Sequence, residues 1–166
     1  SEILHASYLS YYAVIFSVPV ALQWRGRLRD LSEAVFVLLL VFIACFVAYL
    51  IIPVAGPRYL WDSGAAPDGP VRRLTVWLLE ARSSRGTAFP SSHVAVSVAQ
   101  VILAVRYFGR RGWWLALPVA GLAAGAVYGG FHYLVDVIAG AVLGIVVVWA
   151  GLRWTGSHRA NAIAPT

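Results

Sequence analysis

Long apolar runs separated by short polar connections dominate the hydrophobic pattern of this chain. Each run is close to the ~20 residues that an α-helix needs to cross the apolar core of a bilayer. The runs predict five membrane-crossing helices, at residues 3–23, 31–54, 91–108, 113–131 and 133–154. The first is the least apolar, because it contains His5 and a run of serine and tyrosine residues. The expected fold is therefore all-α, a polytopic transmembrane helical bundle.

The connections alternate in charge, which indicates how the bundle is oriented. Three short connections are rich in arginine, at residues 24–30, 106–111 and 153–159. Cytoplasmic loops of membrane proteins carry such a basic excess, so these three are expected on the cytoplasmic side. The long loop at residues 55–90 and the corner at residues 129–132 then face outward. Because five spans leave Ser1 outside, the parent protein is expected to have one more span before it, six in all.

Within the outer loop, residues 71–81 are expected to form a short interfacial helix. Val71, Leu74 and Leu78 recur at the spacing of one helical face, with charged residues off that face. A helix with this pattern lies in the plane of the membrane surface.

Composition agrees with a bilayer environment, since 60% of the 166 residues are hydrophobic and only 12% are charged. A soluble domain has about 25% charged residues. The 13 basic residues are all arginine and lie between the apolar runs rather than on one face, which argues against nucleic-acid binding. The length favours a single membrane-embedded domain over residues 1–160, followed by a disordered tail at residues 161–166.

Glycine recurs at four-residue spacing on the last two predicted spans. The positions are Gly121, Gly125, Gly129, Gly140 and Gly144. Small residues at this spacing let helices approach closely in lipid. Two interpretations are open: the glycines hold His132 in place, or they serve only generic helix packing.

His132 and Asp136 stand four residues apart at the start of the last predicted span. This spacing places both side chains on one helical face, and ionisable groups at the end of a span are costly unless they are used. A carboxylate there can accept a hydrogen bond from one imidazole nitrogen and leave the other free for nucleophilic attack. The alternative is a structural histidine–aspartate pair.

A second candidate site lies at the start of the third predicted span, where residues 89–93 read Phe-Pro-Ser-Ser-His. Proline and serine favour a helix start, and the N-H groups of a first helical turn can bind an anion. Ser91 and Ser92 are therefore candidate phosphate ligands, and His93 is a candidate proton donor. The alternative is a serine cap beside an incidental histidine.

Arg58, in the sequence Gly-Pro-Arg-Tyr after the second predicted span, is the third candidate. A guanidinium fork matches the oxygens of a phosphate, although an isolated arginine there would be an ordinary interface residue. The predicted topology places Arg58, His93 and His132 on the same side of the membrane, at the ends of three different spans. Their convergence predicts a phosphate site.

The motif Pro-Ser-Ser-His at residues 90–93, followed by His132 and Asp136, resembles the type 2 phosphatidic acid phosphatase superfamily. The resemblance implies that His132 is a nucleophile that forms a phosphohistidine and that Asp136 orients it. It further implies that His93 protonates the leaving group and that Ser91 helps to bind phosphate. The implied enzyme needs neither a metal ion nor a cofactor.

The sequence departs from the superfamily pattern at the other cationic phosphate ligands. The lysine that usually stands seven residues before the arginine of the first motif is replaced by Ile51. The serine–arginine pair that normally precedes the nucleophile falls on Gly125 and Ala126. Arg85, or else Arg82, is therefore expected to complete the phosphate clamp.

The resemblance covers about residues 53–144. Within the superfamily, the chain is similar to the inositolphosphotransferase-like branch, the bacterial relatives of inositol phosphorylceramide synthase. The motifs that carry this similarity are Gly-Pro-Arg, Phe-Pro-Ser-x-His and Tyr-x3-His-Tyr-x2-Asp. The resemblance implies a lipid phosphatase or phosphotransferase that uses water or an alcohol as acceptor, in a bacterial-type inner membrane with an extracytoplasmic active site. Transfer of an inositolphosphoryl-type headgroup is one alternative. A catalytically silent, lipid-binding membrane scaffold is an alternative from another class.

Overall fold

The computed structural model describes residues 2–60, 69–82 and 85–161, and within them the fold is all-α, as predicted. The α-helices are α1 (Glu2–Leu9), α2 (Tyr11–Trp24), α3 (Leu28–Ile51), α4 (Pro70–Arg82), α5 (Ser92–Phe108), α6 (Ala116–Tyr128) and α7 (Leu134–Asn161). Two short 3-10 helices are η1 (Pro57–Tyr59) and η2 (Gly109–Leu115). Instead of a β-strand, these described segments contain one isolated parallel bridge, between Val54 and Thr87.

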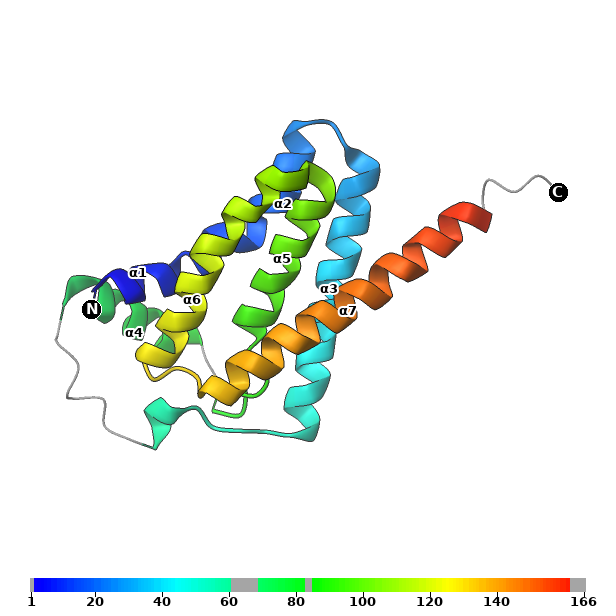
Figure 1. The fold of residues 1–166 in the computed structure, drawn as a ribbon. Helices are drawn as coiled ribbons and strands as arrows, with labels where there is room; N and C mark the ends of the chain where they lie inside the picture. The colour runs from blue at the N-terminus through cyan, green and yellow to red at the C-terminus, as the bar shows by residue number, and fades with distance from the viewer. Residues whose placement is uncertain (1, 61–68, 83–84, 162–166) are drawn as a thin grey trace.

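Within the described residues, four helical stretches are long and apolar enough to cross a membrane. They are Glu2–Trp24, Leu28–Ile51, Ser92–Tyr128 and Leu134–Ser157. The third has 37 residues and reverses direction at η2, so α5 and α6 run as two antiparallel arms (Figure 1). These arms correspond to the third and fourth predicted spans. The prediction of a polytopic transmembrane helical bundle is confirmed.

The first predicted span is bent, and a buried side chain of α5 compensates one of its weak points. Helices α1 and α2 meet at Ser10, whose hydroxyl donates to the carbonyl of Ser7 at 2.6 Å. Inside α2, Pro19 lacks the N-H that would bond to the carbonyl of Ile15. The side-chain amide of the fully buried Gln100 donates to that carbonyl instead.

The fourth predicted span is shorter than expected, because glycines interrupt the helix at both ends. Gly109 has φ of 62° and begins the 3-10 turn, so α6 itself starts only at Ala116. Gly130 has φ of 69° and forms the expected tight corner into α7. Helix α7 is longer than predicted and extends past the other helices to Asn161 (Figure 1). The remainder of the predicted tail, residues 162–166, lies outside the described residues.

Four of the five glycines predicted to allow close packing lie at contacts between helices, whereas a Cβ at Gly129 would collide with the ring of Phe131. A Cβ atom at Gly140 of α7 would collide with the backbone of Ser91 at the start of α5. One turn later Gly144 meets α5 in the same way. On α6, a Cβ at Gly125 would collide with the carbonyl oxygen of Leu4 in α1. The close approach predicted from the spacing is confirmed.

The outer surface of the bundle carries large exposed apolar side chains. On α3 and α7 they include Leu39, Ile43, Phe46, Leu50, Val135, Ile138, Val142, Ile145 and Trp149. An apolar surface of this extent is unsuited to water and suits contact with lipid tails. The chain is an integral membrane protein.

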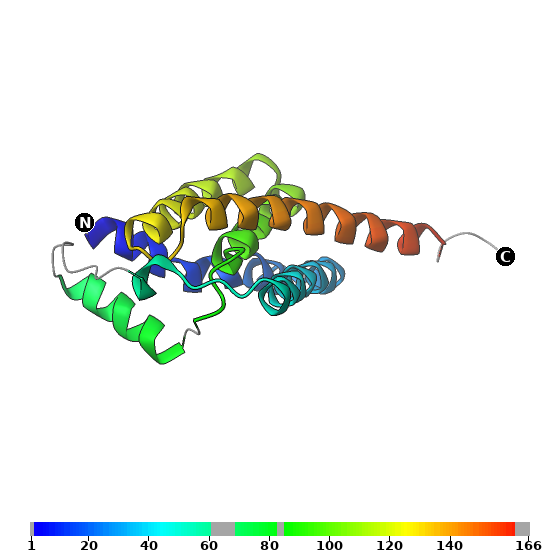
Figure 2. The same cartoon turned by 90° about the horizontal axis from the view of Figure 1, so that it is seen from below.

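Helix α4 confirms the helix predicted at residues 71–81. The carboxylate of Glu2 in α1 accepts hydrogen bonds from the backbone N-H of Val71 at 2.7 Å and of Arg72 at 3.4 Å. A carboxylate at this position satisfies free N-H groups and complements the helix dipole. It ties α4 to α1, on the side of the bundle away from α7 (Figure 2). Leu78 of α4 thereby reaches the cavity described next.

Candidate active site

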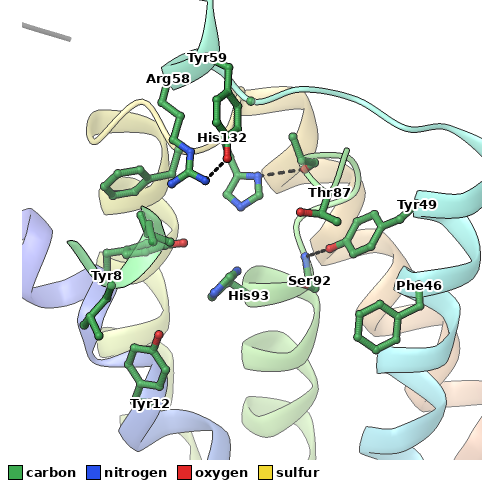
Figure 3. Close-up of a pocket in the computed structure, with 15 residues that line it drawn as sticks. Tyr8, Tyr12, Phe46, Tyr49, Arg58, Tyr59, Thr87, Ser92, His93 and His132 are labelled. Carbon is green, nitrogen blue, oxygen red and sulfur yellow. Dashed lines mark hydrogen bonds between the residues drawn. The ribbon is translucent and has the colours of Figure 1, made fainter. Parts of the chain in front are cut away.

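A cavity of about 280 Å³ lies at the end of the bundle where α3 ends and where α5 and α7 begin. Its walls come from α1 to α5, from η1 and from the loops that precede η1, α5 and α7. The polar side chains that line it are Tyr8, Tyr12, Tyr49, Arg58, Tyr59, Thr87, Ser92, His93 and His132. Figure 3 shows Arg58, His93 and His132 pointing into this space from three different elements. The structure thus brings the three predicted motifs together.

His132 lies in the corner between α6 and α7 and is buried, with 6% of its surface exposed. Its backbone N-H donates to the carbonyl of Ala126 at 3.1 Å. The ring atom Nδ1 lies 3.0 Å from the carbonyl oxygen of Ala88. Because a carbonyl oxygen only accepts hydrogen bonds, this contact assigns the proton to Nδ1 and leaves the lone pair on Nε2. In Figure 3, Nε2 faces the cavity on the side of His93.

Asp136 lies beside His132 but is not its nearest acceptor, which differs from the sequence prediction. The carboxylate oxygen Oδ2 is 3.7 Å from Nδ1 of His132 and accepts a hydrogen bond from the backbone N-H of Tyr133 at 2.8 Å. The predicted contact assumed that both residues share a helical face, whereas α7 begins only at Leu134. The carboxylate is 1% exposed, so its charge still acts on the imidazole at short range.

The position of the Ala88 carbonyl is fixed by the chain ends of two spans. Val54, which follows α3, and Thr87, which precedes α5, form the isolated parallel bridge. The backbone N-H of Ala88 donates to the carbonyl of Val54 at 3.1 Å. This pairing presents the Ala88 carbonyl to His132. The sequence does not indicate this contact, because any residue type in the loop would present the same backbone carbonyl.

The two serines at the start of α5 have different surroundings. Ser91 is fully buried, and its hydroxyl accepts from the backbone N-H of Val94 at 3.4 Å as a helix cap. Ser91 does not line the cavity, and the phosphate-binding role expected of it stays a prediction. Ser92 lines the cavity instead, and its backbone N-H donates to the hydroxyl of Tyr49 at 3.2 Å. The serine positioned to meet a ligand is therefore Ser92.

His93 stands opposite His132 across the cavity. The centroids of the two imidazole rings are 6.1 Å apart. Aromatic rings from the N-terminal helices surround His93, with centroids at 4.3 Å for Tyr11 and 5.4 Å for Tyr8. A small group placed between the two imidazoles can contact a nitrogen of each.

Arg58 reaches the cavity because its motif docks onto the α6–α7 corner. Its backbone N-H donates to the carbonyl of Gly130 at 3.0 Å. A Cβ at Gly56 would lie only 2.8 Å from the carbonyl oxygen of Phe131, so the first residue of Gly-Pro-Arg has room for glycine only. The guanidinium donates to the hydroxyl of Tyr59 and lies 4.5 Å from the centroid of that ring. It stands at the mouth of the cavity (Figure 3).

The additional cation expected at the site lies near it. The guanidinium carbon of Arg85 is 5.6 Å from the centroid of the Tyr59 ring, and the side chain is exposed. Tyr59 thus contacts both Arg58 and Arg85. The side chain of Arg82, the other candidate, lies outside the described residues.

The fold explains why the two positions of the usual serine–arginine pair hold small residues. Ala126 is fully buried, and its carbonyl accepts the backbone N-H of His132. Gly125 lies directly against the backbone of Leu4. Helix α1 therefore occupies the space that a longer side chain in place of Gly125 would need.

Four tyrosines that were not predicted as site residues also line the cavity, namely Tyr8, Tyr12, Tyr49 and Tyr59. A usable indication was the serine and tyrosine run in the first predicted span, which made that span unusually polar. Hydroxyls in a span are costly in lipid unless they face a partner or a cavity. Two of these four tyrosines come from that run.

Among the described residues, no three His, Cys, Asp or Glu side chains are grouped closely enough to hold a metal ion.

A family model described as the PAP2 superfamily matches residues 1–150. No curated protein and no solved structure matches the chain. The matched region contains all the residues that line the cavity.

Proposed function

The chain belongs to the PAP2 superfamily, and from this premise we propose that it transfers the phosphoryl group of a lipid phosphate or diphosphate through a phosphohistidine on His132. Membership supports a lipid phosphatase or phosphotransferase type of function. The observation that carries the finer proposal is the orientation of His132. Its Nδ1 is engaged by the Ala88 carbonyl at 3.0 Å, which directs the lone pair of Nε2 into a cavity shared with His93 and Arg58.

In the first step, Nε2 of His132 attacks the phosphorus and the bond from phosphorus to the ester oxygen breaks. His93, in its protonated form, gives its proton to the departing oxygen. The phosphorylated imidazole becomes cationic, and the carboxylate of Asp136, 3.7 Å from Nδ1, stabilises that charge. The Ala88 carbonyl keeps the ring in place throughout.

In the second step, His93 is neutral and accepts a proton from the incoming water or alcohol. The oxygen of that acceptor attacks the phosphorus, and the bond from phosphorus to Nε2 of His132 breaks. The histidine pair returns to its starting protonation state. Residues of the chain supply every proton transfer, so the proposed cycle is independent of metal ions.

The nonbridging oxygens of the phosphate are held by Arg58 and Ser92, both of which line the cavity. Arg85 completes the clamp by turning from its position against Tyr59 toward the bound phosphate. The capping role of Ser91 fixes the first turn of α5 and so positions Ser92 and His93. Ser91 thus acts indirectly in this proposal.

Water as acceptor makes the protein a phosphatase, and an alcohol makes it a transferase. Tyrosine hydroxyls around the cavity favour a second candidate, the transfer of an inositolphosphoryl-type headgroup. Tyr8, Tyr12, Tyr49 and Tyr59 offer hydrogen bonds that suit a polyhydroxylated molecule. Product analysis in the presence and absence of such an alcohol separates the two activities.

We place the cavity on the extracytoplasmic side of a bacterial-type inner membrane. The support is the distribution of arginine, because the arginine-rich turns from α2 to α3 and from α5 to α6 lie at the opposite end of the bundle (Figure 1). Basic turns of this kind face the cytoplasm.

The proposed function is tested by trapping the covalent intermediate. The purified chain is incubated in detergent with a lipid monophosphate or diphosphate and with excess EDTA, then rapidly quenched and analysed by peptide mass spectrometry. We expect a phosphoryl group on the peptide that contains His132 and release of phosphate or of a phosphorylated headgroup. Lipid binding with neither a modified peptide nor a released product would instead identify a silent lipid-binding scaffold.

Replacement of Asp136 by asparagine is expected to lower kcat on the order of 10- to 100-fold. Asparagine retains an oxygen that can accept the N-H of Tyr133, so the start of α7 is preserved, but the charge beside His132 is lost. The loss is smaller than that of the nucleophile, because the Ala88 carbonyl still fixes the ring. Steady-state kinetics on one lipid substrate provides the measurement. An unchanged kcat would remove Asp136 from the mechanism.

A further inference from the structure

A second hollow lies at the end of the bundle opposite the candidate active site. It has a volume of about 700 Å³ and runs between α2, the end of α5 and η2. Arginine side chains stand at its rim, and its floor is apolar. We call it the arginine groove, lined by Arg25, Arg110, Arg111, Val18, Ala21 and Leu115.

The positive charge of the arginine groove is not neutralised within the described residues. Two other arginines at this end have acidic partners: Arg27 lies 2.7 Å from Asp30, and Arg106 lies 2.9 Å from Glu33. In contrast, no acidic side chain in the described part of the chain forms an ion pair with the three arginines of the groove. The three exposed guanidinium groups of the groove are therefore available to an anion.

The rim of the groove is held in place by tight local packing. A Cβ at Gly112 would collide with the backbone of Ala104, so η2 packs directly onto α5. Gly109, with φ of 62°, starts this turn, and the two glycines bracket the adjacent arginines of the rim. Directly after α2, the guanidinium of Arg25 lies 4.7 Å from the centroid of the Phe108 ring, a contact that holds it against the end of α5.

The depth of the groove indicates the kind of anion. Val18 precedes Arg25 by seven residues on α2, which corresponds to about 10 Å along a helix axis. The floor therefore runs from the interface into the apolar layer, where an acyl chain fits and a soluble anion or an acidic protein does not. Trp113 and Trp114, which are exposed beside the rim, are of the type found at the headgroup level.

We propose that the arginine groove binds an anionic glycerophospholipid from the leaflet opposite the candidate active site. The phosphate of the headgroup binds to the arginine rim, where guanidinium groups match its oxygens. One acyl chain lies on the apolar floor along Ala21 and Leu115. The bound lipid is a structural ligand, distinct from the substrate of the cavity at the other end.

The test compares two lipids with identical acyl chains, phosphatidylglycerol and phosphatidylcholine, by native mass spectrometry of the detergent-purified chain. We expect phosphatidylglycerol to bind at least about 10-fold more tightly, and the variant Arg111→Gln to lose that preference. Arg153→Gln is the matched control, because Arg153 is exposed near the far end of α7 and does not line the groove. Its preference should be unchanged.

A second variant tests the acyl-chain site without changing the charge. Ala21→Trp fills the floor of the groove and should weaken phosphatidylglycerol binding as well, so the proposal remains testable even if the arginine variant folds poorly. Equal binding of the two lipids would overturn the proposal. So would full retention of the preference in Arg111→Gln or of the phosphatidylglycerol affinity in Ala21→Trp. Displacement of the lipid by equimolar inorganic phosphate would identify a soluble-anion site and would also overturn it.

Discussion

Replacement of His132 by alanine is expected to lower kcat on the order of 10⁴-fold or more, because the variant loses the nucleophile itself. The hydrogen bond from Nδ1 to Ala88 is also lost, but the backbone bond from His132 to Ala126 remains, so the corner should stay folded. The measurement is single-turnover and steady-state kinetics with a lipid monophosphate, alongside a thermal unfolding curve. Normal turnover by the variant would exclude a phosphohistidine at this position.

The His93→Ala variant is a control that separates the two histidines by role. General acid catalysis contributes typically 10²- to 10⁴-fold, and its contribution is largest when the leaving group is a basic alkoxide. A lipid diphosphate releases a phosphate ester, which needs less protonation. The His93→Ala variant should therefore recover part of its activity on the diphosphate, whereas His132→Ala should fail on both substrates. Equal losses of both variants on both substrates would argue against the assigned roles.

Hydrophobic periodicity was sufficient to predict the helical bundle and the helix at residues 71–81. Both follow from burial and lipid exposure, which the residue types record directly along the chain. The arginine pattern then placed Arg58, His93 and His132 at one end of the bundle, and the structure brings them to one cavity. The predicted topology was enough for this, because the helix ends on one side of a membrane are confined to a thin layer and therefore lie close together.

Side-chain contacts at the site were harder to predict, because they depend on where each helix begins. The four-residue spacing of His132 and Asp136 predicts a direct contact only inside a helix, and α7 starts two residues after His132. Likewise Ser91 precedes α5 and caps it, which turns its hydroxyl inward and leaves the cavity to Ser92. The residue at which α5 or α7 begins therefore decides which groups the side chains of Ser91 and Asp136 contact.

Replacement of Gly140 by alanine is expected to destabilise the bundle by about 1–3 kcal/mol, the usual cost of overpacking a close contact. The new Cβ would collide with the backbone of Ser91, so α7 must move away from the start of α5. That movement strains the hydrogen bond from the N-H of Ser91 to the carbonyl of Asp136, now 3.0 Å long. Activity should fall together with stability, although no group that touches the substrate has changed.

Gly156→Ala is the matched control on the same helix, because nothing lies within 4 Å of a Cβ built at Gly156. Alanine has the higher helix propensity, so this variant should be neutral or stabilised by up to about 1 kcal/mol, with normal activity. Unfolding in mixed detergent micelles, followed by circular dichroism, compares the two variants. Equal stability of Gly140→Ala and Gly156→Ala would contradict the close contact between α5 and α7. Lower stability of Gly140→Ala with unchanged kcat would instead show that this contact supports the fold without positioning the catalytic histidines.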